Sequence, residues 1–183
     1  SLPYFGAWCI VDLCEDDGDI CRLAVLHPDP DKQAVARELH QRYPPNSDDP
    51  FGAPRVIRSG RPEVMVGVSE EALAGTTRDT EHLHLIRELG ISAYVIAPMV
   101  VRGRMLGAMT FVTAEEGRRF GDIDVTLAED LATRAAFAVE NARLHTDALQ
   151  SRKEADEARA RAEEAKAVAE SANQAKSDFL AIM

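Results

Sequence analysis

The feature that most constrains the fold is a long C-terminal stretch without a helix breaker. Residues 122–183 contain neither proline nor glycine, the two residues that interrupt or weaken a helix most strongly. Apolar side chains near the start of this stretch recur close to helical spacing: Val125, Leu127, Ala128, Leu131, Ala135 and Ala138. We therefore expect one helix to span the whole stretch.

The N-terminal part of the chain predicts a β-hairpin. Residues 8–13 and 21–26 are short apolar runs, and the acidic segment 15–19 between them contains Gly18. Two apolar runs joined by an Asp/Gly turn are typical of a hairpin. Apolar residues occupy both alternation faces of the first run, which indicates a strand covered on both sides.

The middle of the chain alternates between helices and a strand. Residues 30–43 predict a helix that Pro44 ends, and residues 54–59 predict a short helix closed by Gly60. Residues 63–66 predict a strand. Residues 69–89 then predict a helical stretch with Ser69 as N-cap and Gly90 as C-cap.

Residues 92–101 and 105–113 are the strongest strands in the sequence. Arg102 and Gly103 separate them, which predicts a tight hairpin turn. The element order therefore indicates an α+β fold, with a central antiparallel β-sheet flanked by helices and a long C-terminal helix.

Two segments resemble the GAF domain family. Residues 97–111 are similar to the central hairpin of these domains, with a glycine turn followed by Gly107 between apolar residues. Phe120 and the apolar positions after it resemble the family's C-terminal helix. The resemblance covers about residues 4–147 and implies a regulatory sensory domain. The family usually begins with a helix before the first strand, and here that helix is expected to be truncated.

A second resemblance lies at the C-terminus. Residues 175–183 are similar to the segment that leads into the phosphoacceptor motif of sensor histidine kinases. This resemblance implies histidine-kinase domains downstream in the same chain, a protein-histidine kinase as the parent, and a role in a two-component phosphorelay. The fragment contains neither the phosphoacceptor histidine nor a glycine-rich nucleotide loop, so we expect no catalytic residues within it.

The tail also carries the heptad pattern of a coiled coil. Alternating steps of three and four residues connect Ala155, Ala158, Ala162, Ala165, Ala169, Ala172, Lys176 and Phe179. We therefore expect a GAF-like sensory domain over residues 1–147. Residues 148–183 are then a coiled-coil linker that pairs in a parallel homodimer. The alternative is a long solvated helix in which alanine serves helix propensity.

Charge and hydropathy limit the partners. The net charge is −10, and acidic residues exceed basic ones mainly in residues 1–150. An acidic domain without a basic stripe is poorly suited to nucleic acid. No apolar run in this segment is long enough to span a membrane. Three cysteines in a chain of this size are expected to be free thiols in the cytoplasm.

No metal or catalytic constellation is expected. Cys9, Cys14 and Cys21 lack the close pairing of a zinc site. His82 and His84 are two residues apart on a predicted helix, so their side chains point about 200° apart and cannot share one ion. We interpret both histidines as surface or capping residues.

The GAF resemblance implies a small-molecule pocket between one sheet face and the helices of residues 40–90. Trp8, Tyr94, His84 and Arg87 are the candidate lining residues; the alternative places the aromatic pair in the core and the other two at the surface. No cofactor is evident, and the small molecule is unidentified. A second functional hypothesis is a ligand-free dimerisation or spacer domain that relays signals from an upstream domain.

Overall fold

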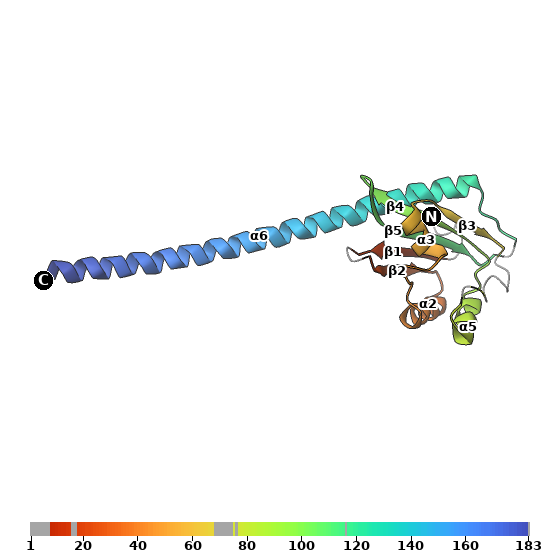
Figure 1. Cartoon of the computed structure of the whole chain (residues 1–183), viewed down its shortest axis with the longest axis horizontal. Helices are drawn as coiled ribbons and strands as arrows, with labels where there is room; N and C mark the ends of the chain where they lie inside the picture. Colours follow the sequence, from red (N-terminus) through yellow and green to blue (C-terminus); the bar gives the residue numbers. More distant parts are fainter. Residues whose placement is uncertain (1–7, 16–17, 68–74, 76, 116, 183) are drawn as a thin grey trace. The chain divides into compact units, whose positions relative to one another are not determined.

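The computed structural model describes residues 8–15, 18–67, 75, 77–115 and 117–182. The chain forms two compact units, Ser1–Ala138 and Val139–Met183. The elements, labelled in Figure 1, are β1 (Trp8–Cys14), β2 (Ile20–Leu26), α2 (Pro30–Arg42), α3 (Gly52–Ser59), β3 (Glu63–Val66), α5 (Thr80–Leu89), β4 (Ala93–Val101), β5 (Arg104–Thr113) and α6 (Asp122–Ile182). The expected α+β class and the long C-terminal helix are confirmed.

The five strands form one sheet in the order β2-β1-β5-β4-β3, and every neighbouring pair is antiparallel. Both predicted hairpins are present. Arg102 and Gly103 have φ values of 51° and 78°, the positive values that a type I′ turn requires at both central positions. This turn joins β4 to β5, the longest antiparallel pair of the sheet.

The local helix signals are largely confirmed. Gly60 and Gly90 end α3 and α5 in the left-handed conformation, as predicted. Helix α3 begins two residues earlier than predicted, at Gly52. Helix α5 begins at Thr80, with Asp79 as its N-cap. The predicted N-cap Ser69 and the opening residues 1–6 lie outside the described residues.

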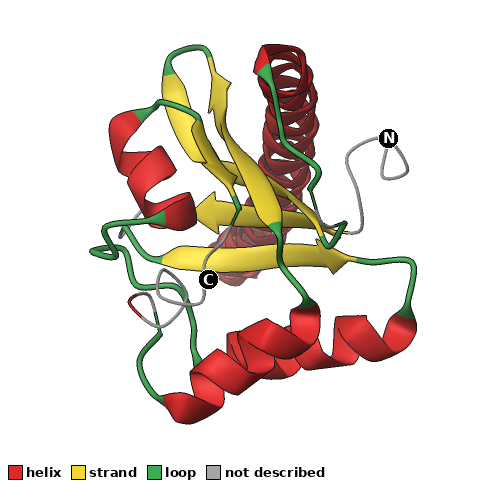
Figure 2. Cartoon of the chain, turned by 90° about the vertical axis from the view of Figure 1, so that its right-hand side faces the viewer, coloured by secondary structure: helices red, strands yellow, loops and turns green. Residues whose placement is uncertain are grey.

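One side of the sheet, here called the helix face, packs against the first turns of α6. Figure 2 shows these turns on the opposite side of the sheet from α2 and α5. Strand residues Val95, Met99 and Phe111 on this face are at most 1% exposed. Helix α6 contributes a stripe of alanines with 0% exposure at four-residue spacing: Ala128, Ala132 and Ala136. The burial of these small side chains indicates that this stripe of the helix faces the sheet.

The other side, here called the cavity face, is covered by α2, α3 and α5. Trp8 and Val112 pack with Ala36 of α2 and Leu89 of α5 in one buried cluster. A second cluster joins Ala53 and Val56 of α3 to Ile96 and Ala108 of the sheet. The two clusters meet at Tyr94, which packs against both. The three helices therefore form a layer with the cavity face as its floor.

The second unit is helical from Val139 to Ile182. Every side chain from 141 to 164 is exposed in the single chain, including Ala155, Ala158 and Ala162 of the predicted seam. The side chains of Ala165, Ala169, Ala172 and Phe179 lie outside the described set. Pairing in a coiled coil stays a prediction. Among the described residues, no helix combines the length and the apolar character needed to cross a membrane.

Candidate functional site

A cavity of about 460 Å³ lies between the cavity face and its layer of helices. Its floor is formed by side chains of β1, β4 and β5, among them Trp8, Ile10 and Tyr94. Leu39 of α2 and Leu89 of α5 belong to its walls. The volume lies within the range of small-molecule sites, roughly 300–1,000 Å³, and the mainly apolar lining is typical of them.

Trp8 forms a wall of the cavity and is 2% exposed. Its ring lies against that of His27, with centroids 4.2 Å apart and planes tilted by 40°. His27 Nδ1 accepts a hydrogen bond of 2.9 Å from the backbone N–H of Asp29, the residue that caps α2. Packing of Trp8 thereby fixes the step from β2 into α2. The indole Nε1 is buried without a hydrogen-bond partner.

Tyr94 contributes its ring to the cavity, while its hydroxyl is committed elsewhere. The hydroxyl donates to Glu63 Oε1 at 2.8 Å, and Gly52 N donates to the same oxygen at 3.1 Å. Arg55 Nη1 donates to Glu63 Oε2 at 2.9 Å. Burial, followed by the hydrogen bond to Glu63, raises the pKa of Tyr94. The network ties the start of α3 to β3 and β4, which fixes one wall of the cavity.

A buried ion pair lines the cavity at β1 and β2. Arg22 Nε and Nη2 donate to Asp12 Oδ1 and Oδ2 at 2.7 and 3.2 Å. Asp12 is 1% exposed and the Arg22 side chain 18%. Burial lowers the pKa of the His40 imidazole on α2, and the nearby positive charge of Arg22 lowers it further. A bidentate pair of this kind is geometrically specific.

The rim near α5 is a small stacked network. The rings of Tyr43 and His82 are parallel within 5°, with centroids 4.2 Å apart. The Tyr43 hydroxyl donates to Asp79 Oδ1 at 2.8 Å. His82 Nδ1 accepts from the backbone N–H of Arg78 at 3.1 Å. Burial, and then the charge of Arg78, lowers the pKa of His82, so this imidazole is kept neutral as an acceptor.

The predicted site residues fall into two groups. Trp8 and Tyr94 line the cavity, whereas His84 and Arg87 are exposed on α5 and are not among its lining residues. Their helix presents other positions to the cavity, namely His82, Ile86 and Leu89. These three follow the i, i+4, i+7 spacing of one helical face, so His84 points to nearly the opposite side.

Sequence reasoning missed His82 and the Asp12–Arg22 pair. The capping interpretation of His82 agrees with the hydrogen bond that its Nδ1 accepts from the backbone N–H of Arg78, just before α5, but its place in the cavity lining was not predicted. The signal for Asp12 was a lone acid within the apolar run of β1. Its cross-strand partner in the sheet register is Arg22, a pairing that becomes visible once the register is known.

The described residues contain no group of three or more His, Cys, Asp or Glu side chains suited to a metal ion. All three cysteines are free. Burial raises the pKa of the Cys9 thiol to about 11, which keeps this thiol protonated and poorly nucleophilic at neutral pH.

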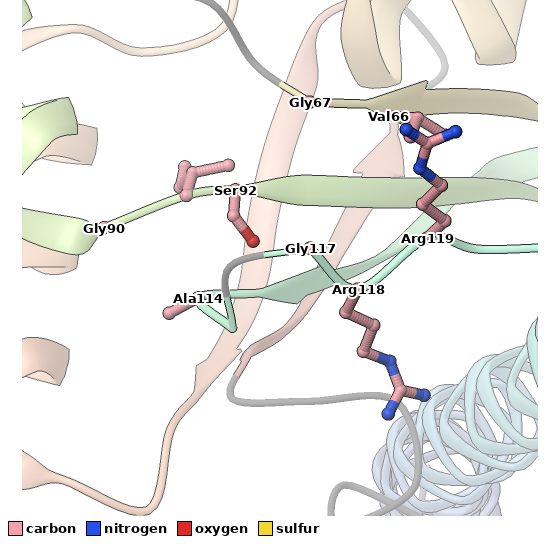
Figure 3. A pocket seen from close by; sticks show the side chains of 9 residues that line it. Val66, Gly67, Gly90, Ser92, Ala114, Gly117, Arg118 and Arg119 are labelled. Atoms are coloured by element: carbon pink, nitrogen blue, oxygen red, sulfur yellow. The ribbon is translucent and has the colours of Figure 1, made fainter.

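A second hollow of about 520 Å³ lies where β4 begins and β5 ends. Figure 3 shows that the side chains of Arg118 and Arg119 at this hollow point away from each other. Ser92 Oγ donates to the carbonyl oxygens of Thr113 and Glu115, both at 2.9 Å. Because its polar groups do not converge, this hollow is a weaker candidate than the cavity.

Comparison with known families identifies one match. The sequence model of the GAF domain family matches residues 3–139, a span that includes the whole sheet, the cavity and the first turns of α6. A search of curated proteins found no match.

Several solved structures share the fold. A domain assigned to a two-component sensor histidine kinase protein from Sinorhizobium meliloti 1021 has a TM-score of 0.55 and 15% identity, covering 78% of this chain and 84% of that chain. The second GAF domain of DevS from Mycobacterium smegmatis has a TM-score of 0.56 and 14% identity, covering 80% and 89%. A GAF domain/HD domain protein from Geobacter sulfurreducens has a TM-score of 0.54 and 19% identity, covering 76% and 83%. At these identities the likeness establishes the fold.

Proposed function

Because this chain belongs to the GAF domain family, a family of sensory and regulatory signalling domains, we propose that it is a cytoplasmic sensory domain of a sensor histidine kinase in a two-component phosphorelay. In this proposal the cavity binds a small molecule. Helix α6 then passes the bound state to histidine-kinase domains downstream in the same chain, while the fragment itself performs no catalysis.

The observation that carries the proposal is the cavity. It is floored by the centre of the sheet and walled by three helices, and its volume is about 460 Å³. Core side chains of a domain this size normally fill such a space to near-crystalline density. Ligand sites usually have this volume, mainly apolar walls and a few fixed polar groups.

The sheet connects the cavity to the output helix. Along β1, Trp8, Ile10 and Asp12 line the cavity, while the alternate residues Cys9 and Val11 are buried on the helix face. A ligand that shifts β1 therefore shifts the surface on which the first turns of α6 pack. This coupling supports a path from the cavity to α6 that needs no further element.

The exposed second unit supports the dimeric part of the proposal. Helices in proteins gain their stability mostly from packing against a partner surface, and every side chain from 141 to 164 is exposed in the described part of the chain. A parallel homodimer through the alanine seam would supply one. An alanine seam buries little apolar area, so the pairing would be weak enough to respond to a signal.

Native mass spectrometry of the purified fragment, followed by a denaturing run, tests both parts. The expected result is a dimer with extra mass that disappears on denaturation. A dimer of the bare chain, unchanged after incubation with cell metabolites, would instead favour a spacer domain that relays signals without a ligand. If the protein is a monomer at micromolar concentration, the proposal of a dimeric linker is wrong.

Cysteine cross-linking tests the seam itself. In a background without Cys9, Cys14 and Cys21, Ala158→Cys is expected to form an intermolecular disulfide rapidly, because a seam position faces its counterpart in a parallel pair. Ala160→Cys, an exposed alanine off the seam, is the matched control. Equal rates for the two variants would contradict the proposed register.

A further inference from the structure

The ionisable residues that line the cavity are neutralised in pairs. Asp12 is paired with Arg22, and Asp49 lies 3.7 Å from the guanidinium of Arg78. His82 accepts a hydrogen bond from a backbone N–H through Nδ1. Among the described residues, the lining of the cavity therefore offers no net charge to a ligand.

The remaining walls make a charged ligand costly. Ile10, Leu39, Phe51, Ile86 and Ile96 present hydrocarbon to the cavity. An ionised group that enters such a space loses its hydration and must be compensated by an opposite charge. Since each charge at the cavity already has a partner, a phosphate or carboxylate would remain uncompensated.

Among the described residues, Arg22 nevertheless leaves hydrogen-bond donors without an acceptor. A guanidinium carries five N–H groups, and two of them are donated to Asp12. The Asp12 carboxylate is 1% exposed and accepts through both oxygens, and the Tyr94 hydroxyl is committed to Glu63. The polar end of the cavity at Arg22 thus offers donors, held in position by Asp12.

We propose that the ligand of this cavity is an uncharged, mainly apolar organic molecule with a carbonyl-type acceptor at one end, which accepts a hydrogen bond from the free N–H groups of Arg22. The inference rests on the proposed sensory function and adds the chemical class of the ligand. Asp12 acts as a positioning residue, because it orients the guanidinium and cancels its charge.

Two matched probes test the class of ligand. 4-tert-Butylcyclohexanone carries a neutral carbonyl on an apolar body, and 4-tert-butylcyclohexanecarboxylate carries an anion on the same body. Binding is measured by isothermal titration calorimetry at pH 7.5 and by the emission of Trp8, the single tryptophan of the chain, which lines the cavity. We expect the ketone to bind and to shift the Trp8 emission, with the carboxylate at least about tenfold weaker.

Two variants assign the binding. The double variant Asp12→Leu/Arg22→Met replaces the ion pair with hydrocarbon, an exchange that buried pairs often tolerate. It should lower ketone affinity by roughly tenfold or more, the value of a hydrogen bond to a charged group. Thr110→Phe places a ring on the floor of the cavity at a residue outside the pair, and it should abolish binding of both probes. Melting curves of both variants confirm that they fold.

The outcomes separate the ligand class from the proposed function. If Thr110→Phe abolishes binding, the cavity is a ligand site. The inferred ligand class is then wrong if the carboxylate binds as tightly as the ketone. It is also wrong if the double variant binds the ketone with unchanged affinity. If neither probe binds while native mass spectrometry detects a retained ligand, the inference also fails and sensing stands. If neither probe binds and no ligand is retained, both fail.

Discussion

The two faces of the sheet are built from the same strands but use space in opposite ways. On the helix face, Met99, Phe111 and the three buried alanines of α6, at positions 128, 132 and 136, leave almost no exposed surface. On the cavity face, the helix layer packs on the strands through two buried clusters and still leaves a cavity of about 460 Å³. The buried stripe of α6 consists of small side chains, whereas the Glu63 network holds α3 in a fixed place beside the cavity.

The difference indicates a division of labour. The packed face has one arrangement and carries the stability of the unit, since tightly packed cores do not deform continuously. The hollow face carries specificity, and its polar groups are held in place by ion pairs and hydrogen bonds. Substitutions that separate these two roles are the sharpest tests of the comparison.

The largest effect is expected at Gly107 of β5. A Cβ at this position would lie 2.0 Å from the carbonyl oxygen of Asp12 and 2.9 Å from the Cα of Leu13. Both are backbone atoms of the neighbouring strand, so Gly107→Ala should separate β1 from β5 and cost more than about 4 kcal/mol of unfolding free energy. Urea denaturation of the wild type and the variant measures this loss of unfolding free energy.

Gly121→Ala is the matched control, because its Cβ would meet nothing closer than 4.0 Å. A control variant as unstable as Gly107→Ala would show that the effect is general to glycine replacement. A Gly107→Ala protein with wild-type stability would contradict the close strand approach.

The next effect is expected on the cavity face. Arg22→Ala leaves the Asp12 carboxylate, 1% exposed, without its partner. Removing one member of a buried pair should cost about 3 kcal/mol. Thermal unfolding at pH 7.5 measures the loss, and the double variant Asp12→Leu/Arg22→Met should recover most of it. A loss that the double variant does not recover would mean that the pair supports the fold through packing.

A direct comparison of the faces uses one substitution on each. Ala132→Leu adds volume at a position with 0% exposure on the packed face and should cost about 1–3 kcal/mol. Ala53→Leu adds the same volume at a residue that lines the cavity, and we expect it to cost less than about 1 kcal/mol because the side chain enters free space. Denaturant unfolding measures both losses of unfolding free energy. Equal losses would contradict the difference in packing between the two faces.

The smallest effect concerns pH at the cavity rim. Burial and Arg78 lower the pKa of His82 in the folded state, so the neutral form is stabilised by folding. The stability that His82 contributes is fully present above its pKa in the unfolded chain, about 6.5, and is lost as the pH falls through its lower pKa in the folded state. His82→Phe keeps a ring stacked on Tyr43 but cannot titrate.

The difference in melting temperature between the wild type and His82→Phe should therefore shift in favour of the variant between pH 7.5 and pH 5. Comparing the two proteins at each pH cancels the titration of all other groups. A difference that does not change with pH would mean that His82 titrates alike in the folded and unfolded states.

Much of the backbone followed from local residue chemistry. The absence of proline and glycine after Asp122 predicted α6, Arg102 and Gly103 predicted the β4–β5 turn, and Gly60 and Gly90 predicted helix ends. These signals depend on a few adjacent residues and their allowed backbone angles, so they can be read without knowing what packs against them.

The cavity could be predicted only in part. Trp8 and Tyr94 were found because the GAF resemblance implied a pocket beside the sheet and aromatic walls are common in ligand pockets. The side of α5 that faces the cavity could not be found, since His82 and His84 are chemically identical. Their difference arises from where the helix begins, at Asp79, and from its packing.

The Asp12–Arg22 pair was decided by tertiary structure alone. In a regular strand, Arg22 and Val25, three residues apart, would point to opposite faces. The register of β1 with β2 shifts between Val11 and Asp12, and this bulge turns Arg22 to the same face as Val25, so that both line the cavity. The sequence by itself determined where strands, turns and helices form, because those depend on neighbouring residues. Which side chains meet at the cavity depended on register and packing between segments far apart in the chain.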